Sequence, residues 1–241
     1  MKRLFYLIAS AAILFAATAS ANAQEARTAR KVDTKSIFFK GDFFAGIGAG
    51  PSVYFGENDR NMLFHHRIAP AMDIYLGKWI FPWLGLRISY SGGHALGLCN
   101  RWDSPDAHPT GEKYPYSKDE TCYWVDRQAF DYVSIRGDLM LNFTNLFMGA
   151  NPDRLYNISF YGGLGMAKVC EKLEASRFGL TLGLYNTFRV GNALDVVLDV
   201  HAMGLPEDFE SEVGTRPDAD PNGFYSHDGI LTASVGVAYR F

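Results

Sequence analysis

The sequence has little of what several protein classes require. Three cysteines among 241 residues are too few for a small fold held together by disulfides. Lys and Arg number 23 against 26 Asp and Glu, so bulk positive charge cannot hold a nucleic acid. Beyond the N-terminal segment, no stretch reaches the roughly 18 consecutive apolar residues of a membrane-spanning helix. Disulfide miniatures, basic nucleic-acid binders and polytopic helical membrane proteins are therefore excluded.

The N-terminal segment has the features of an export signal. Lys2 and Arg3 precede an apolar run over 4–17, and a small-x-small site, Ala21-Asn22-Ala23, follows. This order of charge, apolar run and small residues predicts a secretory signal peptide over residues 1–23. Residues 24–41 are interpreted as a periplasmic leader, and residues 42–241 as one folded domain. The protein is therefore expected to be exported.

The remaining chain alternates apolar and small or polar residues, which is typical of β-strands with two different faces. In 43–55, for example, the odd positions are apolar, from Phe43 through Ile47 to Phe55, whereas the even positions include Gly46, Gly48 and Ser52. Strands are predicted around 43–55, 68–77, 84–91, 132–143, 158–167, 177–185, 194–201 and 231–241.

The composition of the second face separates a membrane barrel from a soluble one. That face is mostly Gly, Ser, Thr and Tyr, with one or two charges per strand. Glycine weakens a strand unless neighbouring groups need the space, as in the narrow lumen of an eight-stranded barrel. An apolar band around a polar lumen is the transmembrane barrel pattern. The sequence therefore predicts an all-β fold, an eight-stranded antiparallel transmembrane β-barrel with up-and-down meander topology. A secreted lipocalin-like barrel is the alternative.

The connections and aromatic residues indicate how the barrel is oriented. Long loops are predicted at 56–67, 92–127, 168–176 and 204–228, and the intervening connections are short. Long extracellular loops and short periplasmic turns are typical of outer-membrane barrels. The predicted periplasmic end also carries aromatic residues, which favour the lipid headgroup boundary; these include Trp79, Phe81, Trp83, Phe143, Phe188 and Tyr239.

The C-terminus and three internal stretches resemble a known family. The chain ends in Val237-Ala238-Tyr239-Arg240-Phe241, and Val237, Tyr239 and Phe241 resemble the signal that outer-membrane barrels present to the barrel assembly machinery. Residues 55–59, 73–79 and 186–195 resemble segments of OmpA/OmpX-type small barrels of Gram-negative bacteria. The resemblance implies an outer-membrane location. It concerns the barrel alone, because no peptidoglycan-binding domain follows the last strand in this sequence.

Charges on the predicted lumen face suggest an internal plug. They must be paired, because an unpaired buried charge is very costly. The expected network comprises Asp73, Arg87, Arg136, Asp138, Arg177 and Asp199. Together with Tyr75, Tyr132, Tyr161 and Tyr185, these residues are expected to fill the lumen. A narrow passive channel is the alternative.

A third alternative is a barrel enzyme acting on lipid A or phospholipid. His201 with Asp199, or His94, would be its candidates, but no Ser-containing motif accompanies them. Alternation also points His201 inward, away from lipid. The protein is therefore predicted not to be an enzyme, and no cofactor or metal site is expected.

The second long loop carries the remaining candidates. Cys99 and Cys122 are expected to form a disulfide in an oxidising compartment, leaving Cys170 unassigned. The same loop has aromatic residues among charges, a composition typical of binding surfaces; these are Trp102, Tyr114, Tyr116, Tyr123 and Trp124. The predicted function is a structural and surface-interaction role. Its expected partners are outer-membrane lipid and lipopolysaccharide, the assembly machinery, and an extracellular protein or host ligand, but no nucleic acid.

Overall fold

The computed structural model describes residues 42–56, 59, 62–100, 109–114, 125–151, 153–170, 176–206, 209 and 227–241. Within these residues, nine strands form one sheet: β1 (Phe43–Phe55), β2 (Ile68–Phe81), β3 (Leu84–Asn100), β4 (Pro109–Lys113), β5 (Val125–Asn142), β6 (Tyr156–Val169), β7 (Ser176–Arg189), β8 (Leu194–Pro206) and β9 (His227–Arg240). The described connections include two short helices, η3 (Phe64–His66) and α2 (Phe143–Met148). No helix in the described residues is long and apolar enough to span a membrane.

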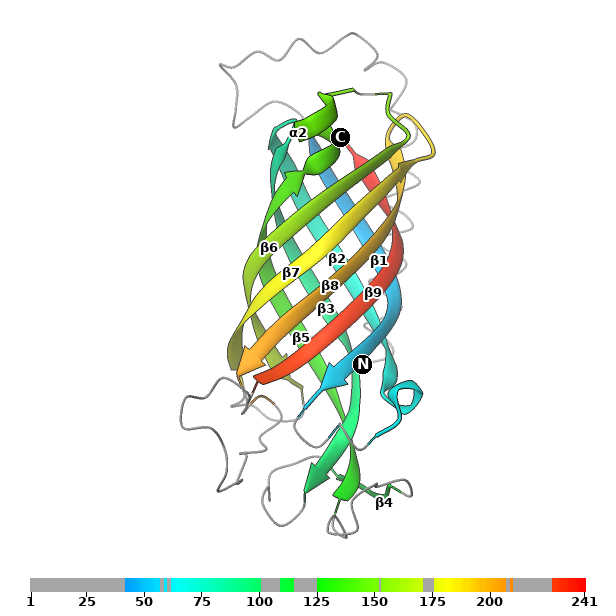
Figure 1. Ribbon diagram of the computed structural model, residues 1–241, viewed down its shortest axis with the longest axis vertical. Helices are drawn as coiled ribbons and strands as arrows, with labels where there is room; N and C mark the ends of the chain where they lie inside the picture. Colours follow the sequence, from blue (N-terminus) through cyan, green and yellow to red (C-terminus); the bar gives the residue numbers. More distant parts are fainter. Residues whose placement is uncertain are drawn as a thin grey trace.

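Eight of these strands close into a barrel with meander connectivity (Figure 1). Each strand pairs antiparallel with the next barrel strand along the chain, and β1 pairs with β9 to complete the cylinder. β4 is not part of the wall, because β3 pairs directly with β5 over the whole length of β3. The predicted fold class is therefore confirmed, with β4 as an additional strand on the edge of β5.

The two faces of the wall are as the alternation predicted. Leu180, Leu182, Val235 and Val237 point outward and are 65%, 71%, 61% and 43% exposed. Their neighbours Thr181 and Ser234 are buried in the lumen. The outer face of the barrel is therefore apolar and the enclosed face is polar, which is the reverse of a soluble barrel.

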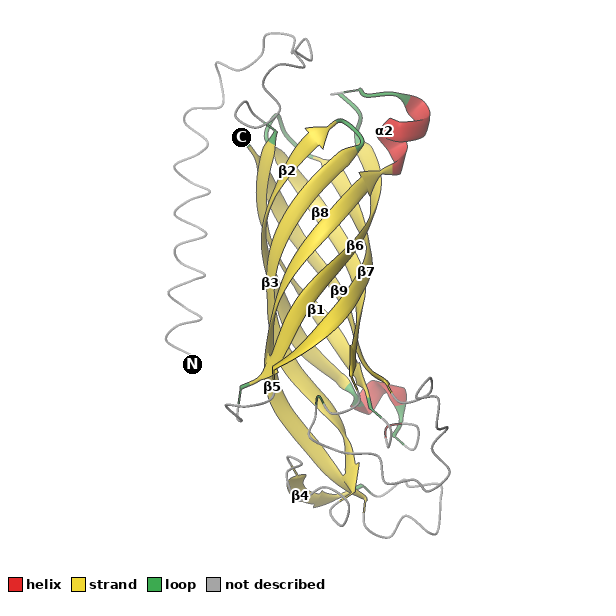
Figure 2. Ribbon diagram, turned by 90° about the vertical axis from the view of Figure 1, so that its left-hand side faces the viewer, coloured by secondary structure: helices red, strands yellow, loops and turns green. Residues whose placement is uncertain are grey.

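The second long loop is shorter than the predicted 92–127. β3 continues to Asn100, and β5 already begins at Val125, so the β3–β5 pair extends past the rest of the wall, with β4 beside its end (Figure 2). Gly92 and Gly93 were interpreted as the start of a loop. Gly93 instead lies inside the strand, where a Cβ atom would come within 2.9 Å of the Cβ of Ala71. Here glycine marks close packing in a strand and not its end.

Candidate functional site

The centre of the lumen is held by Arg87, whose side chain is fully buried. Its Nη2 lies 2.9 Å from Oδ2 of Asp138, and its Nη1 lies 2.8 Å from Oδ2 of Asp199. Ser89 also donates a hydrogen bond to Oδ2 of Asp138, over 3.1 Å. β3, β5 and β8 therefore meet across the lumen through one guanidinium group.

Tyrosine rings enclose this guanidinium. The Tyr161 ring lies 4.0 Å from Cζ of Arg87, and the rings of Tyr75 and Tyr185 each lie at 5.3 Å. Tyr161 also donates a hydrogen bond of 2.6 Å to Oδ1 of Asp199. Gly183 on the adjacent strand makes room for Tyr161, since a Cβ there would lie 2.3 Å from the ring. The guanidinium is thus satisfied by two carboxylates and by the negative faces of the rings.

A second ionic group lies beside the first. Nη2 of Arg136 is 3.5 Å from Oδ1 of Asp73, which also accepts a hydrogen bond from Ser91. His201 connects the two groups, because Nδ1 lies 3.5 Å from Oδ1 of Asp199 and Nε2 lies 4.0 Å from Oδ1 of Asp73. We call Asp73, Arg87, Arg136, Asp138, Asp199 and His201 the ionic tier. Two guanidinium groups face three carboxylates in it, with the His201 ring between two of these carboxylates.

An aromatic tier lies in the lumen on the side of the short turns. Tyr75 and Tyr185 are joined by a hydrogen bond of 3.3 Å between their hydroxyl groups, and Phe44 packs against both rings. Trp79 packs against Phe44 from the end of the barrel. The other members of this buried cluster are Met140, Tyr161, Val197 and Ala238.

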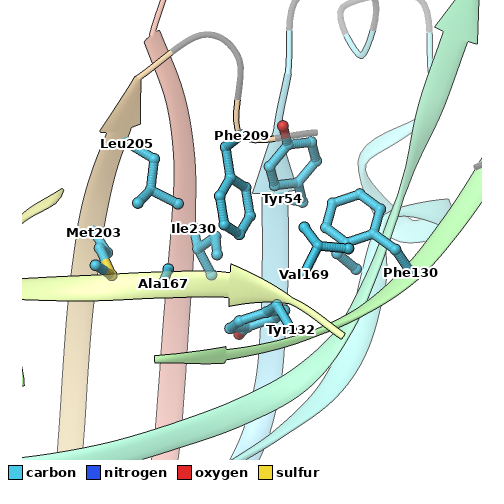
Figure 3. Packing of buried hydrophobic residues seen from close by; sticks show 10 residues of the cluster. Tyr54, Phe130, Tyr132, Ala167, Val169, Met203, Leu205, Phe209 and Ile230 are labelled. Carbon is cyan, nitrogen blue, oxygen red and sulfur yellow. The ribbon is translucent and has the colours of Figure 1, made fainter. Parts of the chain in front are cut away.

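An apolar tier lies in the lumen on the side of the long loops (Figure 3). Tyr54, Phe130 and Phe209 form its centre. The Phe130 ring lies edge-on to the Tyr54 ring at a centroid distance of 5.3 Å and to the Phe209 ring at 6.2 Å. Phe209 comes from the connection between β8 and β9, yet it is fully buried. Its side chain therefore packs inside the barrel at the end that carries the long loops. The remaining members are Ala95, Tyr132, Ala167, Val169, Met203, Leu205 and Ile230.

Five of the six residues predicted for the lumen network lie in the ionic tier, and Arg177 does not. Arg177 is the second residue of β7, at the end of the barrel that carries the long loops. Its Nη1 donates to the carbonyl oxygen of Ser176 over 3.3 Å. Alternation places a residue on a face of the sheet but not at a height along the barrel, so the prediction could not separate Arg177 from the other five residues. His201 was known as a lumen residue from alternation, but its position between two carboxylates was not.

Tyr114, predicted to lie on an exposed contact surface, is buried. It packs with Met62 and Leu98, and its hydroxyl accepts a hydrogen bond of 2.9 Å from the backbone N–H of Leu63. The hydroxyl also lies 3.1 Å from Nδ1 of His66. Tyr114 therefore fastens the first long loop to the second. The other residues predicted for this surface, Trp102, Tyr116, Tyr123 and Trp124, lie outside the described residues.

Asp59 anchors the first long loop to the extended end of β3. Its carboxylate accepts hydrogen bonds of 2.8 Å from the backbone N–H groups of Gly56 and Leu98. Burial raises the pKa of Asp59 to about 6, although the two hydrogen bonds and the positive charge of Arg67 act in the opposite direction. The loop is therefore held by a carboxyl group that titrates just below neutral pH.

Several predictions depend on residues that lie outside the described part of the chain. Cys99 is buried and Cys170 is exposed, whereas Cys122 lies outside the described residues, so the disulfide stays a prediction. The signal peptide over 1–23 and the leader over 24–41 also lie outside them. At the C-terminus, Val237 and Phe241 are exposed on the outer face, and the Tyr239 and Phe241 rings are in contact at 5.1 Å.

Comparison with known proteins agrees with the apolar outer face. No protein-family model matches the sequence. The chain is similar to outer membrane protein 40 of Porphyromonas gingivalis (strain ATCC BAA-308 / W83), with 25% identity over 232 residues that cover 90% of this chain and 53% of that protein. The present chain is a Gram-negative outer-membrane β-barrel. The chain spans about half the length of the curated relative that it matches.

Solved structures similar to this outer-membrane barrel are also small barrels. Neisserial surface protein A is 13% identical, with a TM-score of 0.46, and the match covers 83% of this chain and 97% of that one. For the N-terminal β-barrel domain of Pseudomonas aeruginosa OprF, the identity is 10% and the TM-score 0.44, over 84% and 100% of the two chains. For P. aeruginosa OprG, the values are 8% and 0.45, over 83% and 96%.

Proposed function

We propose that the protein is a non-enzymatic outer-membrane scaffold with a closed lumen, which displays its long loops for surface contacts. The observation that carries the proposal is the stack of three tiers inside the barrel. Arg87 is fully buried in the ionic tier, with the aromatic tier on one side and the apolar tier on the other. A continuous path for water and solutes would have to displace all three tiers.

The position of His201 supports a structural role over an enzymatic one. The residue is 3% exposed and lies between Asp199 and Asp73 inside the barrel. A lipid substrate in the outer leaflet would have to cross the barrel wall to reach it. His94 does lie near the loops, where its Nδ1 is 2.8 Å from Oδ1 of Asp131, but a histidine–carboxylate pair also needs a nucleophile or a bound water to act on an ester.

Planar bilayer recordings test the closed lumen. We expect the folded full-length protein to insert without steady conductance, while an open porin recorded in the same bilayers provides the positive control. Steady, voltage-independent conductance of the wild-type protein would instead support the narrow-channel alternative. Mass spectrometry of lipid A from overproducing cells tests the enzymatic alternative, and an altered lipid species would refute the non-enzymatic role.

The partners of the loops require a separate test. Residues 101–108 and 115–124 would be replaced with Gly/Ser segments, whereas β4 and Tyr114 would be kept because Tyr114 holds the first loop. Adhesion of cells displaying each variant to immobilised host surface proteins and glycans would be compared. Unchanged adhesion would eliminate Trp102, Tyr116, Tyr123 and Trp124 as the contact surface without affecting the closed lumen.

Outer-membrane lipid and lipopolysaccharide are the proposed partners of the outer face, in keeping with its exposed apolar residues. The barrel assembly machinery is the proposed transient partner of Val237, Tyr239 and Phe241. The outward positions of Val237 and Phe241 support this proposal, because a recognition signal must be accessible during assembly.

A further inference from the structure

The connection between β5 and β6 carries a short helix with an unusual surface. α2 follows β5 directly, with Oδ1 of Asn142 accepting a hydrogen bond of 2.8 Å from the backbone N–H of Asn145 at its first turn. Phe147 and Met148 are each 75% exposed, Leu146 is 48% exposed, and Leu155 beyond the helix is 72% exposed. This apolar group lies at the end of the barrel opposite the long loops (Figure 2).

The apolar side of α2 is continuous with the lipid-facing wall. Phe160 points outward from β6 and is 44% exposed. The Phe143 ring packs against it with a centroid distance of 4.6 Å, and the Phe147 ring follows at 5.7 Å from Phe143. Three aromatic rings thus lead from the membrane belt onto the helix without a polar interruption. Phe81 and Trp83 stack on each other at 5.6 Å on the adjoining β2–β3 turn.

The polar side of the helix is fixed to the barrel rim. Nδ2 of Asn145 donates to the carbonyl oxygen of Pro82 over 2.7 Å, and Thr144 accepts a hydrogen bond from the backbone N–H of Ile158. Arg154 donates to Oδ1 of Asn145 and to the carbonyl oxygens of Met148 and Gly149. The helix therefore has a fixed orientation, with its apolar side directed away from these contacts.

The contacts of Arg154 also match a membrane boundary. The last carbonyl groups of a helix lack partners within the helix, and lipid offers none. Arg154 satisfies the carbonyls at the end of α2 and places a positive charge there, which the helix dipole favours.

We propose that α2 is a membrane foot: Leu146, Phe147, Met148 and Leu155 lie in the headgroup boundary of the periplasmic leaflet and bind phospholipid. The continuity from Phe160 through Phe143 to Phe147 selects lipid as the occupant, since the same surface already faces lipid lower on the wall. Amphipathic helices with exposed Phe and Leu bind at this depth. The proposal does not depend on whether the lumen is closed.

Depth-dependent fluorescence quenching tests the foot. Full-length Phe147→Trp and Asn151→Trp would be folded into phosphatidylcholine vesicles, with the wild-type protein providing the emission of the native tryptophans. Asn151 is the matched control because it lies in the same connection and is exposed but polar. Vesicles with brominated acyl chains report contact with lipid, and iodide present on both sides of the bilayer reports contact with water.

We expect the added emission of Phe147→Trp to be blue-shifted, several-fold more quenched by brominated lipid than that of Asn151→Trp, and protected from iodide. If both variants are quenched equally by iodide, the foot is refuted. Protection from iodide without quenching by brominated lipid would mean that protein, such as a second copy of this chain, covers the helix, and would also overturn the proposal. Met148→Trp provides a second reporter if Phe147→Trp does not fold.

Discussion

Replacing Arg87 with methionine tests whether the ionic tier stabilises the barrel through charge compensation. Methionine keeps an unbranched side chain, shorter than that of arginine, and removes the guanidinium. Asp138 and Asp199, whose contacts with Arg87 measure 2.9 and 2.8 Å, would then remain buried without that partner. Removal of one partner from a buried ion pair costs about 3–5 kcal/mol. Because Arg87 serves two carboxylates, we expect Arg87→Met to lose an amount in the upper part of that range.

The free energy of unfolding would be measured by urea titration of the vesicle-inserted protein, followed by tryptophan fluorescence and by heat-modifiable gel migration. The control is the triple variant Arg87→Met, Asp138→Asn and Asp199→Asn, which removes the charges together. It should recover most of the loss, since replacing a whole buried ionic group is often close to neutral. An Arg87→Met protein that unfolds at the wild-type urea concentration would refute charge compensation, and so would a triple variant as unstable as the single one.

Two further perturbations probe the lumen wall and the first loop. Gly183→Ala places a Cβ 2.3 Å from the Tyr161 ring and should lower the free energy of unfolding by about 1–3 kcal/mol in the same titration. The control Gly137→Ala, whose Cβ would have no atom within 4 Å, should be close to neutral, and equal effects of the two variants would contradict the packing argument. The pKa of Asp59, raised to about 6 by burial, means that the folded state binds this proton more tightly than the unfolded state. This stabilisation is fully present below the ordinary carboxyl pKa and is lost as the pH rises through about 6, so the protein should be about 1 kcal/mol more stable at about pH 5 than at about pH 7.5. Urea titrations at the two pH values should show this difference in the wild type and its loss in Asp59→Asn; a difference that persists in the variant would assign it to another group.

The sequence predicted the barrel because successive residues of a strand point to opposite faces of the wall, so that apolar and polar residues alternate. Leu180, Leu182 and Thr181 illustrate this, since one-residue steps move side chains between lipid and lumen. The chemical difference between these faces also predicted which one is inside. Alternation carries no information on height, however. It could therefore place both Arg87 and Arg177 on the lumen side without showing that only Arg87 reaches the ionic tier.

Features outside the regular wall were predicted less well. Tyr114 was assigned to a contact surface because aromatic residues are common there, but an aromatic ring between two loops can equally bury itself, as this one does against Met62 and Leu98. The sequence around α2 has a local signal that could have been found: Asn142 is a typical N-cap, Phe143 and Phe147 are four residues apart, and a glycine, Gly149, follows. The structure confirms this signal, since Gly149 has a positive φ of 75°. Phe209 has no such signal, because its burial depends on where a long connection returns to the barrel.

The three tiers explain why a narrow barrel of this kind is filled with side chains of different chemistry at different heights. Towards the two ends, large apolar and aromatic groups such as Phe209 and Trp79 pack against the buried clusters of the lumen. The ionic tier between them has no access to water through the lipid-covered wall, so each charge must be satisfied by another residue of the lumen, as Arg87 is by two carboxylates and the Tyr161 ring. Moving any member of the ionic tier would leave the charge of another without its partner. With the lumen filled in this way, the outer wall, the loops and α2 are the surfaces through which we expect this protein to contact other molecules.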